Sequence, residues 1–133
     1  KSSYNAKEDS SLVLKKDQIT SNINKKLFEL VDARSKDRFL GLQPESRQEL
    51  RSGNIEGSKN IPFTELINAA DHTFKDKKEL LSIFKNNKID DTVKIAFTCG
   101  SGVTACILGL ANSIISGKKP IIYDGSWAEY GLK

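Results

Sequence analysis

An apolar run, a glycine-rich turn that contains a cysteine, and a long apolar helical stretch follow one another without interruption between residues 93 and 116. Residues 93–98 are predicted as a buried strand, and residues 103–116 as a helix that ends at Gly117. Strands that alternate with helices are typical of a mainly parallel sheet with helices on both faces. Functional groups of such sheets lie beyond the carboxyl ends of the strands, where Cys99 lies.

The rest of the chain continues this alternation of strands and helices. Strands are predicted at residues 12–14, 27–31 and 121–123, and helices at residues 17–24, 62–70 and 77–87. Asp17 and Asp76 stand near the starts of two of these helices, and Ser126 opens a final helix with capping-box spacing to Glu129. Residues 34–60 follow neither period, which predicts a long loop of functional importance.

Length and composition bound the domain organisation and the class of partner. The 133 residues fit one domain over residues 11–133, with residues 1–10 as a polar linker or disordered lead. Because the chain begins with Lys1 and contains no methionine, we expect it to be part of a longer protein. No apolar run approaches the roughly 20 residues of a membrane helix, so no membrane contact is predicted. The net charge of +4 has no accompanying nucleic-acid motif, so no direct nucleic-acid binding is predicted either.

Cys99 is the predicted nucleophile of the chain. Loop amides beside the glycines and the free N–H groups of the following helix favour an anion at this position, which predicts a lowered pKa for the thiol. The alternative is a small buried residue at a strand end, since free cysteines are often buried. A single histidine, His72, and the absence of a C-x-x-C pair predict no metal site.

A cysteine in such a loop suits phosphate-ester hydrolysis, arsenate reduction or sulfur transfer, which all form a covalent bond to the thiolate. Cysteine phosphatases need an arginine six positions after the cysteine to clamp the phosphoryl oxygens. That position is occupied by Ala105. A persulfide carries at most one negative charge, which backbone amides can stabilise, so sulfur transfer is favoured.

The sequence Cys-Gly-Ser-Gly-Val-Thr-Ala at residues 99–105 resembles the active loop of the rhodanese-type sulfurtransferases, in particular of their mercaptopyruvate branch. Further matching motifs lie at residues 31–34, 38–41, 44–47, 60–63 and 123–127. The resemblance covers about residues 12–132. It implies an α/β, three-layer rhodanese-like domain, corresponding to the second, catalytic domain of tandem proteins, with the first domain outside this sequence.

The resemblance also implies a substrate site. It assigns attack on the donor sulfur to Cys99, donation of a proton or hydrogen bond to Ser101, and the substrate carboxylate to Arg38 and Arg47. Gly100, Gly102, Val103 and Thr104 complete the substrate-binding loop. Thiosulfate-preferring relatives carry Arg and Lys after the cysteine, whereas this chain has Gly100 and Ser101, which favours 3-mercaptopyruvate as the donor.

The implied product is a Cys99 persulfide, from which a thiol acceptor such as thioredoxin takes the sulfur, in a cycle that needs no cofactor. The alternative is a persulfide carrier that relays sulfur from a protein donor to partners, for example in tRNA thiolation. An inert scaffold is disfavoured because the cysteine is present. The compartment is predicted to be cytoplasmic, mitochondrial or both.

Other residues receive more modest predictions. Cys106 is expected in the core rather than as a resolving thiol, Trp127 in the packing, and His72 at the surface. Asp32 and Asp124 close two strands and either fix loop hydrogen bonds or serve ordinary turns. Arg34 and Arg51 either pair with nearby carboxylates or touch the substrate.

Overall fold

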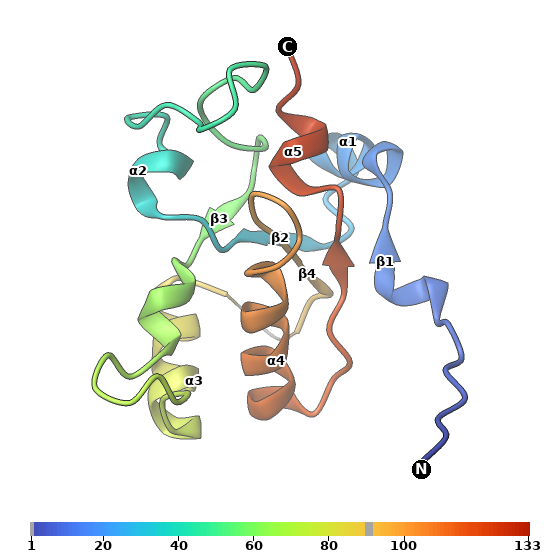
Figure 1. Ribbon diagram of the computed structural model, residues 1–133, viewed down its shortest axis with the longest axis vertical. Coiled ribbons are helices and arrows are strands. Elements are labelled where there is room, and N and C mark those ends of the chain that lie inside the picture. Colours follow the sequence, from blue (N-terminus) through green and yellow to red (C-terminus); the bar gives the residue numbers. More distant parts are fainter. Residues whose placement is uncertain (1, 90–91) are drawn as a thin grey trace.

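The computed structural model of the chain describes residues 2–89 and 92–133 and forms an α/β domain (Figure 1). Within the described residues, five strands make one sheet in the order β1-β5-β4-β2-β3, and each pair of neighbouring strands is parallel. Their bounds are β1 Val13–Leu14, β2 Glu29–Asp32, β3 Lys59–Asn60, β4 Ile95–Thr98 and β5 Ile122–Tyr123. The predicted parallel α/β sheet is confirmed, and β4, which leads to Cys99, is its central strand.

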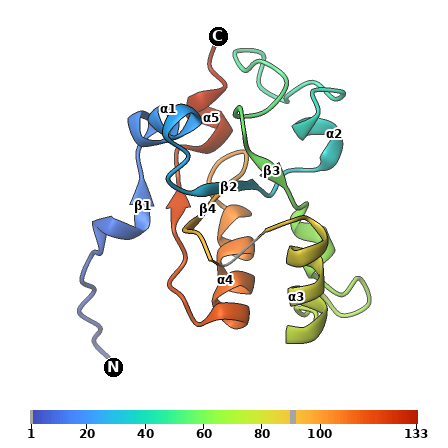
Figure 2. The ribbon, with the colours of Figure 1, turned by 180° about the vertical axis from the view of Figure 1, so that it is seen from behind.

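Helices cover both faces of the sheet (Figures 1 and 2). One face carries α3 (Lys77–Asn86), α4 (Ala105–Ser116) and the 3-10 turn Phe63–Leu66, and the other carries α1 (Lys16–Lys25) and α5 (Ser126–Tyr130). A short helix, α2 (Lys36–Phe39), lies beyond the carboxyl ends of the strands, and a 3-10 turn, Ser10–Leu12, precedes β1.

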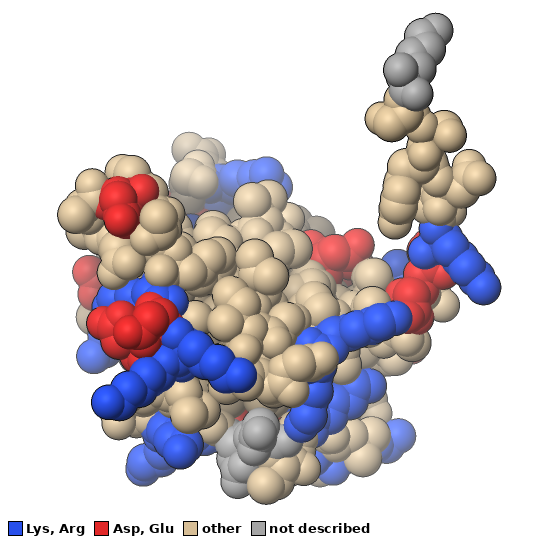
Figure 3. Space-filling model, turned by 90° about the horizontal axis from the view of Figure 1, so that it is seen from below, with Lys and Arg blue, Asp and Glu red and all other residues tan. Residues whose placement is uncertain are grey.

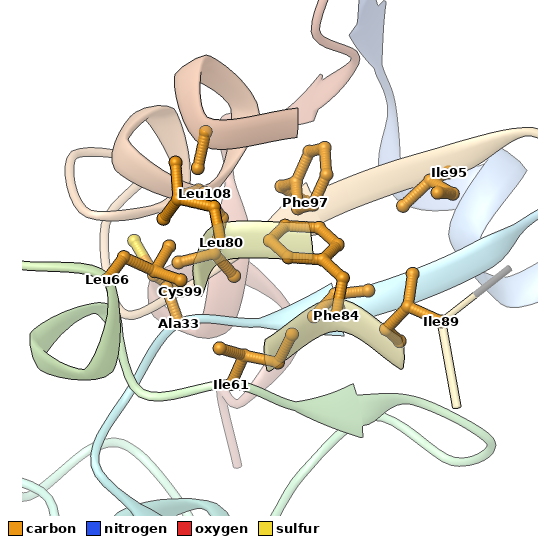
Figure 4. Packing of buried hydrophobic residues seen from close by; sticks show 13 residues of the cluster. Ala33, Ile61, Leu66, Leu80, Phe84, Ile89, Ile95, Phe97, Cys99 and Leu108 are labelled. Carbon is orange, nitrogen blue, oxygen red and sulfur yellow. The ribbon is translucent and has the colours of Figure 1, made fainter. Parts of the chain in front are cut away.

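The alternation of side chains along the central strands divides the interior into two cores. Val31 and Phe97 point to the layer of α3 and α4, while their neighbours Leu30 and Ala96 point to α1 and α5. Figure 4 shows Phe97 against Phe84 of α3, an edge-on ring pair with centroids 6.5 Å apart. Because β2 and β4 are buried on both faces, the loops at their carboxyl ends start from fixed positions.

Two predicted elements differ in the structure. Residues 62–70 form only one 3-10 turn, because Ile67 makes an antiparallel bridge to Phe74 and the Asn68 amide donates to the Thr73 carbonyl at 2.8 Å. These bonds use the backbone groups that a helix would need. The predicted loop at 34–60 is not without structure, since it contains α2 and β3.

Helix starts provide one confirmation and two corrections. Asp76 caps α3, because its carboxylate accepts from the Glu79 amide at 2.8 Å and the Glu79 side chain accepts from the Asp76 amide. The helix expected from residue 103 begins at Ala105. The capping box predicted at Ser126 is wrong: the cap position of α5 is Gly125, and the Ser126 hydroxyl bonds to other groups.

Candidate active site

Cys99 follows the last residue of β4 and begins the loop that leads into α4. Figure 1 shows this loop between β4 and α4. Only 2% of its surface is exposed. The backbone amide of Gly102 donates a hydrogen bond to its Sγ at 3.1 Å. The loop therefore curls around the sulfur and directs a backbone donor at it.

The amino-terminal end of α5 holds this loop in place. The amide of Trp127 donates to the Cys99 carbonyl at 2.9 Å, and the amide of Ala128 donates to the Gly100 carbonyl at 2.8 Å. The Ser126 hydroxyl accepts from the Cys99 amide at 3.1 Å and donates to the Tyr123 carbonyl at 2.8 Å. Ser126 has a φ of 51°, unusual for a residue with a side chain, which fits a position that its surroundings strongly constrain.

Gly102 is required by the path of the loop. Its φ is +86°, and a Cβ at this position would lie 2.8 Å from the carbonyl oxygen of Asp124. The loop thus crosses the β5–α5 connection at a distance that only glycine permits.

The pKa of the Cys99 thiol lies below its ordinary value. Burial is the largest single influence and raises this pKa. Donors act in the opposite direction, first the hydroxyl of Thr104 and then the backbone amides of Ala105, Ser101 and Gly102. The donors outweigh burial, so the direction predicted from the sequence is confirmed.

Cys99 opens into a pocket of about 210 Å³. The structure brings most of the predicted site residues together in its wall: Arg38, Arg47, Cys99, Gly100, Ser101, Val103 and Thr104. Gly102 is a buried residue of the same loop and does not line the pocket, but its amide donates to Cys99 Sγ. Glu45, Ser46, Leu50 and Ala128 complete the lining.

A buried ion-pair network backs the arginine side of the pocket. Arg34 pairs with Asp32 at 2.8 Å and with Glu45 at 2.9 Å, and each of these side chains is 1% exposed. Glu45 also pairs with Arg38 at 2.5 Å. Glu45 was not among the predicted site residues, although its place between two candidate substrate arginines in the long loop was an available signal.

Arg34 and Arg51 do not line the pocket. Both guanidinium groups lie over the ring of Trp127, with the guanidinium carbon of Arg34 4.6 Å and that of Arg51 5.0 Å from the ring centroid. The two arginines were predicted either to pair with nearby carboxylates or to touch the substrate. Arg34 pairs with carboxylates, those of Asp32 and Glu45. The prediction that Trp127 packs is confirmed, since it is 1% exposed.

The prediction for Cys106 is wrong. It lies in the first turn of α4 and is exposed, with its Sγ 3.4 Å from the Gly102 carbonyl oxygen. The apolar sequence around it fits a core, but the helix turns this position outward. Partial burial, and secondarily the negative charge of a Cys99 thiolate, raise the pKa of the Cys106 thiol.

The remaining predicted residues lie where they were expected. Asp32 accepts from the Arg34 amide at 2.9 Å and so fixes the start of the loop, whereas Asp124 serves an ordinary turn through the Gly125 amide. His72 is exposed.

Three observations concern other kinds of partner. Among the described residues, no group of three or more His, Cys, Asp or Glu side chains is arranged to hold a metal ion. None of the helices within residues 2–89 and 92–133 is long and apolar enough to cross a membrane. On the face seen in Figure 3, Lys and Arg side chains are scattered and interspersed with Asp and Glu.

The fold and the site together define an α/β domain whose central strand ends in a loop that directs backbone donors at a cysteine. The family model described as "Rhodanese-like domain" matches residues 15–133. The chain therefore belongs to the rhodanese family.

Named relatives cover most of this chain. It is 39% identical over 131 residues, or 98% of its length, to a 3-mercaptopyruvate sulfurtransferase of Mus musculus. It is 39% identical over 128 residues, 96% of its length, to a thiosulfate sulfurtransferase of Bos taurus. The chain spans less than half of each relative, 43% in both cases.

A solved relative has the same fold. The 3-mercaptopyruvate sulfurtransferase SseA from Escherichia coli superposes with a TM-score of 0.77 at 31% identity, covering 94% of this chain and 45% of that one. The yeast mitochondrial complex I sub-stoichiometric sulfur transferase subunit superposes with a TM-score of 0.80 at 34% identity, covering 90% of this chain and 42% of that one.

Proposed function

We propose that the chain is the catalytic domain of a sulfurtransferase that takes sulfur from 3-mercaptopyruvate as a persulfide on Cys99. One observation carries the proposal: the Cys99 thiol, with its lowered pKa, opens into a pocket that also contains Arg38 and Arg47. A nucleophilic sulfur and two guanidinium groups in one pocket suit a donor that carries both a sulfur and a carboxylate.

In the proposed reaction the Cys99 thiolate attacks the sulfur of 3-mercaptopyruvate. A sulfur–sulfur bond forms, the sulfur–carbon bond breaks, and its electron pair passes to the carbon, giving the enolate of pyruvate. Ser101, which is exposed at the pocket, donates a proton or a hydrogen bond to this enolate. The proton of the transferred SH group passes to the enolate directly or by way of Ser101, which leaves pyruvate and the Cys99 persulfide anion. The amide of Gly102 and the other loop donors stabilise the persulfide anion, as they stabilise the thiolate.

A thiol acceptor such as thioredoxin or a small thiol then attacks the outer sulfur and restores the Cys99 thiolate. This cycle requires no cofactor. Relatives of this chain include both mercaptopyruvate and thiosulfate sulfurtransferases. Gly100 and Ser101 support mercaptopyruvate, because no cation follows the cysteine to receive a second negative charge.

The whole protein is proposed to contain a further rhodanese-like domain, since this chain covers less than half of its named relatives. A second candidate function is relay of the persulfide to protein partners, for example in tRNA thiolation. It is favoured by the relative that is described as a subunit of yeast mitochondrial complex I. We propose a cytoplasmic or mitochondrial location for the protein, and the mitochondrial origin of the same relative supports the second of these.

The test is intact-mass measurement of the reduced protein after incubation with 3-mercaptopyruvate and, separately, with thiosulfate. We expect a gain of one sulfur atom from 3-mercaptopyruvate, and no gain in a folded Cys99→Ser variant. A Cys106→Ser variant is the matched control and should still gain the sulfur. No gain from either donor in the folded protein would contradict turnover of a free donor by this domain.

A further inference from the structure

Glu45 contacts two arginines, Arg38 in the pocket wall and Arg34 in the buried network behind it. Its carboxylate accepts from Arg34 Nη1 at 2.9 Å, from Arg38 Nη2 at 2.5 Å and from Arg38 Nε at 3.3 Å. The Glu45 side chain is 1% exposed, whereas that of Arg38 is 33% exposed. A buried carboxylate thus holds a guanidinium that itself reaches the pocket.

These contacts leave only one edge of the Arg38 guanidinium group available to bind a ligand. The Nε–Nη2 edge is occupied by Glu45, so the Nη1–Nη2 end remains free. This end lies over Gly100, where an added Cβ would be 3.1 Å from Nη2 and 3.8 Å from Nη1. Glu45 therefore presents Arg38 to the residue that follows Cys99.

Glu45 also sets the charge of this side of the pocket. Arg34 and Arg38 contribute two positive charges to the buried network. Asp32 and Glu45 contribute two negative charges, so the network is neutral. Arg47, which is exposed and has no ion-pair partner among the described residues, supplies the remaining positive charge of the pocket wall.

We propose that Glu45 is a positioning residue that sets the charge of the donor accepted: it fixes Arg38 over Gly100 and cancels one positive charge, so that the pocket favours a ligand with one negative charge over one with two. The inference rests on the proposed function for its biological meaning. Its physical content, the preference between singly and doubly charged anions, does not require sulfur transfer.

The test uses two tetrahedral anions of similar size, methanesulfonate with one negative charge and sulfate with two. Each is titrated as a protectant of Cys99 against alkylation by iodoacetamide, at constant ionic strength, with the Cys99 peptide quantified by mass. In the wild type, we expect methanesulfonate to protect at the lower concentration. Better protection by sulfate would overturn the proposal without any variant.

The variant Glu45→Gln removes the charge and keeps the shape of the side chain. It should shift the ratio of the two half-protecting concentrations about fivefold toward sulfate, the size expected for one elementary charge several ångströms away in a partly solvated site. The control Glu49→Gln changes the net charge equally at an exposed position outside the pocket, and its ratio should equal that of the wild type. An unchanged ratio in folded Glu45→Gln would overturn the proposal.

A second variant and a second readout separate this proposal from the proposed function. Glu45→Asp keeps the charge but shortens the reach to Arg38, so it should retain the preference for methanesulfonate while weakening protection by both anions. Persulfide formation should shift in the same direction, with Glu45→Gln favouring thiosulfate over 3-mercaptopyruvate relative to wild type. Absence of a persulfide in the wild type, together with the shifted protection ratio, would reject the sulfur donor and retain the role of Glu45.

Discussion

The Ser126 hydroxyl and the Cys99 amide are joined by a hydrogen bond of 3.1 Å between the first residue of α5 and the start of the cysteine loop. Ser126 is fully buried, and the same hydroxyl donates to the Tyr123 carbonyl at 2.8 Å. One side chain thus joins the ends of two parallel strands, β4 and β5, at the point where the site begins.

Ser126→Ala should destabilise the domain by about 1–3 kcal/mol, because it leaves the buried Cys99 amide without its acceptor. Alanine also has a Cβ, so the strain of the positive φ is unchanged. Urea denaturation measures the loss. Ser82→Ala on the exposed face of α3 is the control, and its effect should stay within about 0.5 kcal/mol. Equal effects of the two substitutions would contradict the role given to Ser126.

Gly102→Ala should cost more stability than Gly57→Ala. Both glycines have positive φ, +86° and +78°, so each substitution carries a left-handed backbone cost of about 1–2 kcal/mol. The added Cβ meets nothing within 4 Å at Gly57 but lies 2.8 Å from the Asp124 carbonyl oxygen at Gly102. The difference between their free energies of unfolding isolates this close approach. We also expect slower alkylation of Cys99 in Gly102→Ala, since the amide that donates to Sγ is displaced.

Thr104→Val should raise the pKa of the Cys99 thiol. The Thr104 hydroxyl is the largest of the influences that lower this pKa, and valine keeps the branched shape without the donor. Because iodoacetamide reacts with the thiolate, the midpoint of the pH–rate profile should move to higher pH. Thr104→Ser retains a hydroxyl and should keep the midpoint near that of the wild type. A midpoint that does not move in Thr104→Val would show that the backbone amides suffice.

Cys99 should react with iodoacetamide before Cys106 at neutral pH, although Cys106 is the more exposed thiol. The pKa of Cys99 is lowered and that of Cys106 is raised, so the thiolate fraction favours the buried residue. Peptide mapping after brief alkylation measures the order. Preferential labelling of Cys106 would mean that access to the pocket, rather than ionisation, controls reactivity.

Features that depend on neighbours in sequence were predictable. The strand, turn and helix around Cys99, the cap at Asp76 and the lowered pKa of the thiol arise from local backbone donors and local periodicity. The helix predicted from Pro62 failed because backbone groups of this segment bond instead to Ala33, Thr73 and Lys75. Local spacing cannot reveal such competition.

Features that depend on distant segments were not predictable from spacing. The capping box at Ser126 was a reasonable reading of Ser and Glu three residues apart, but the hydroxyl bonds to Cys99, 27 residues earlier. The partners of Glu45 are set by the folded path of the long loop. The outward position of Cys106 follows from how α4 packs against the sheet, which buries Ala105, Leu108 and Ala111 instead.

The contacts of α5 with the cysteine loop bear on the order in which the protein matures during synthesis. The loop carbonyls of Cys99 and Gly100 receive their hydrogen bonds from Trp127 and Ala128, and β1 finds its place only against β5. The ribosome must therefore release β5 and α5 before β1 can join the sheet and before the thiol acquires its final surroundings. Pairings so distant along the chain form slowly, and a nascent chain halted before Ser126 would carry an incompletely organised nucleophile.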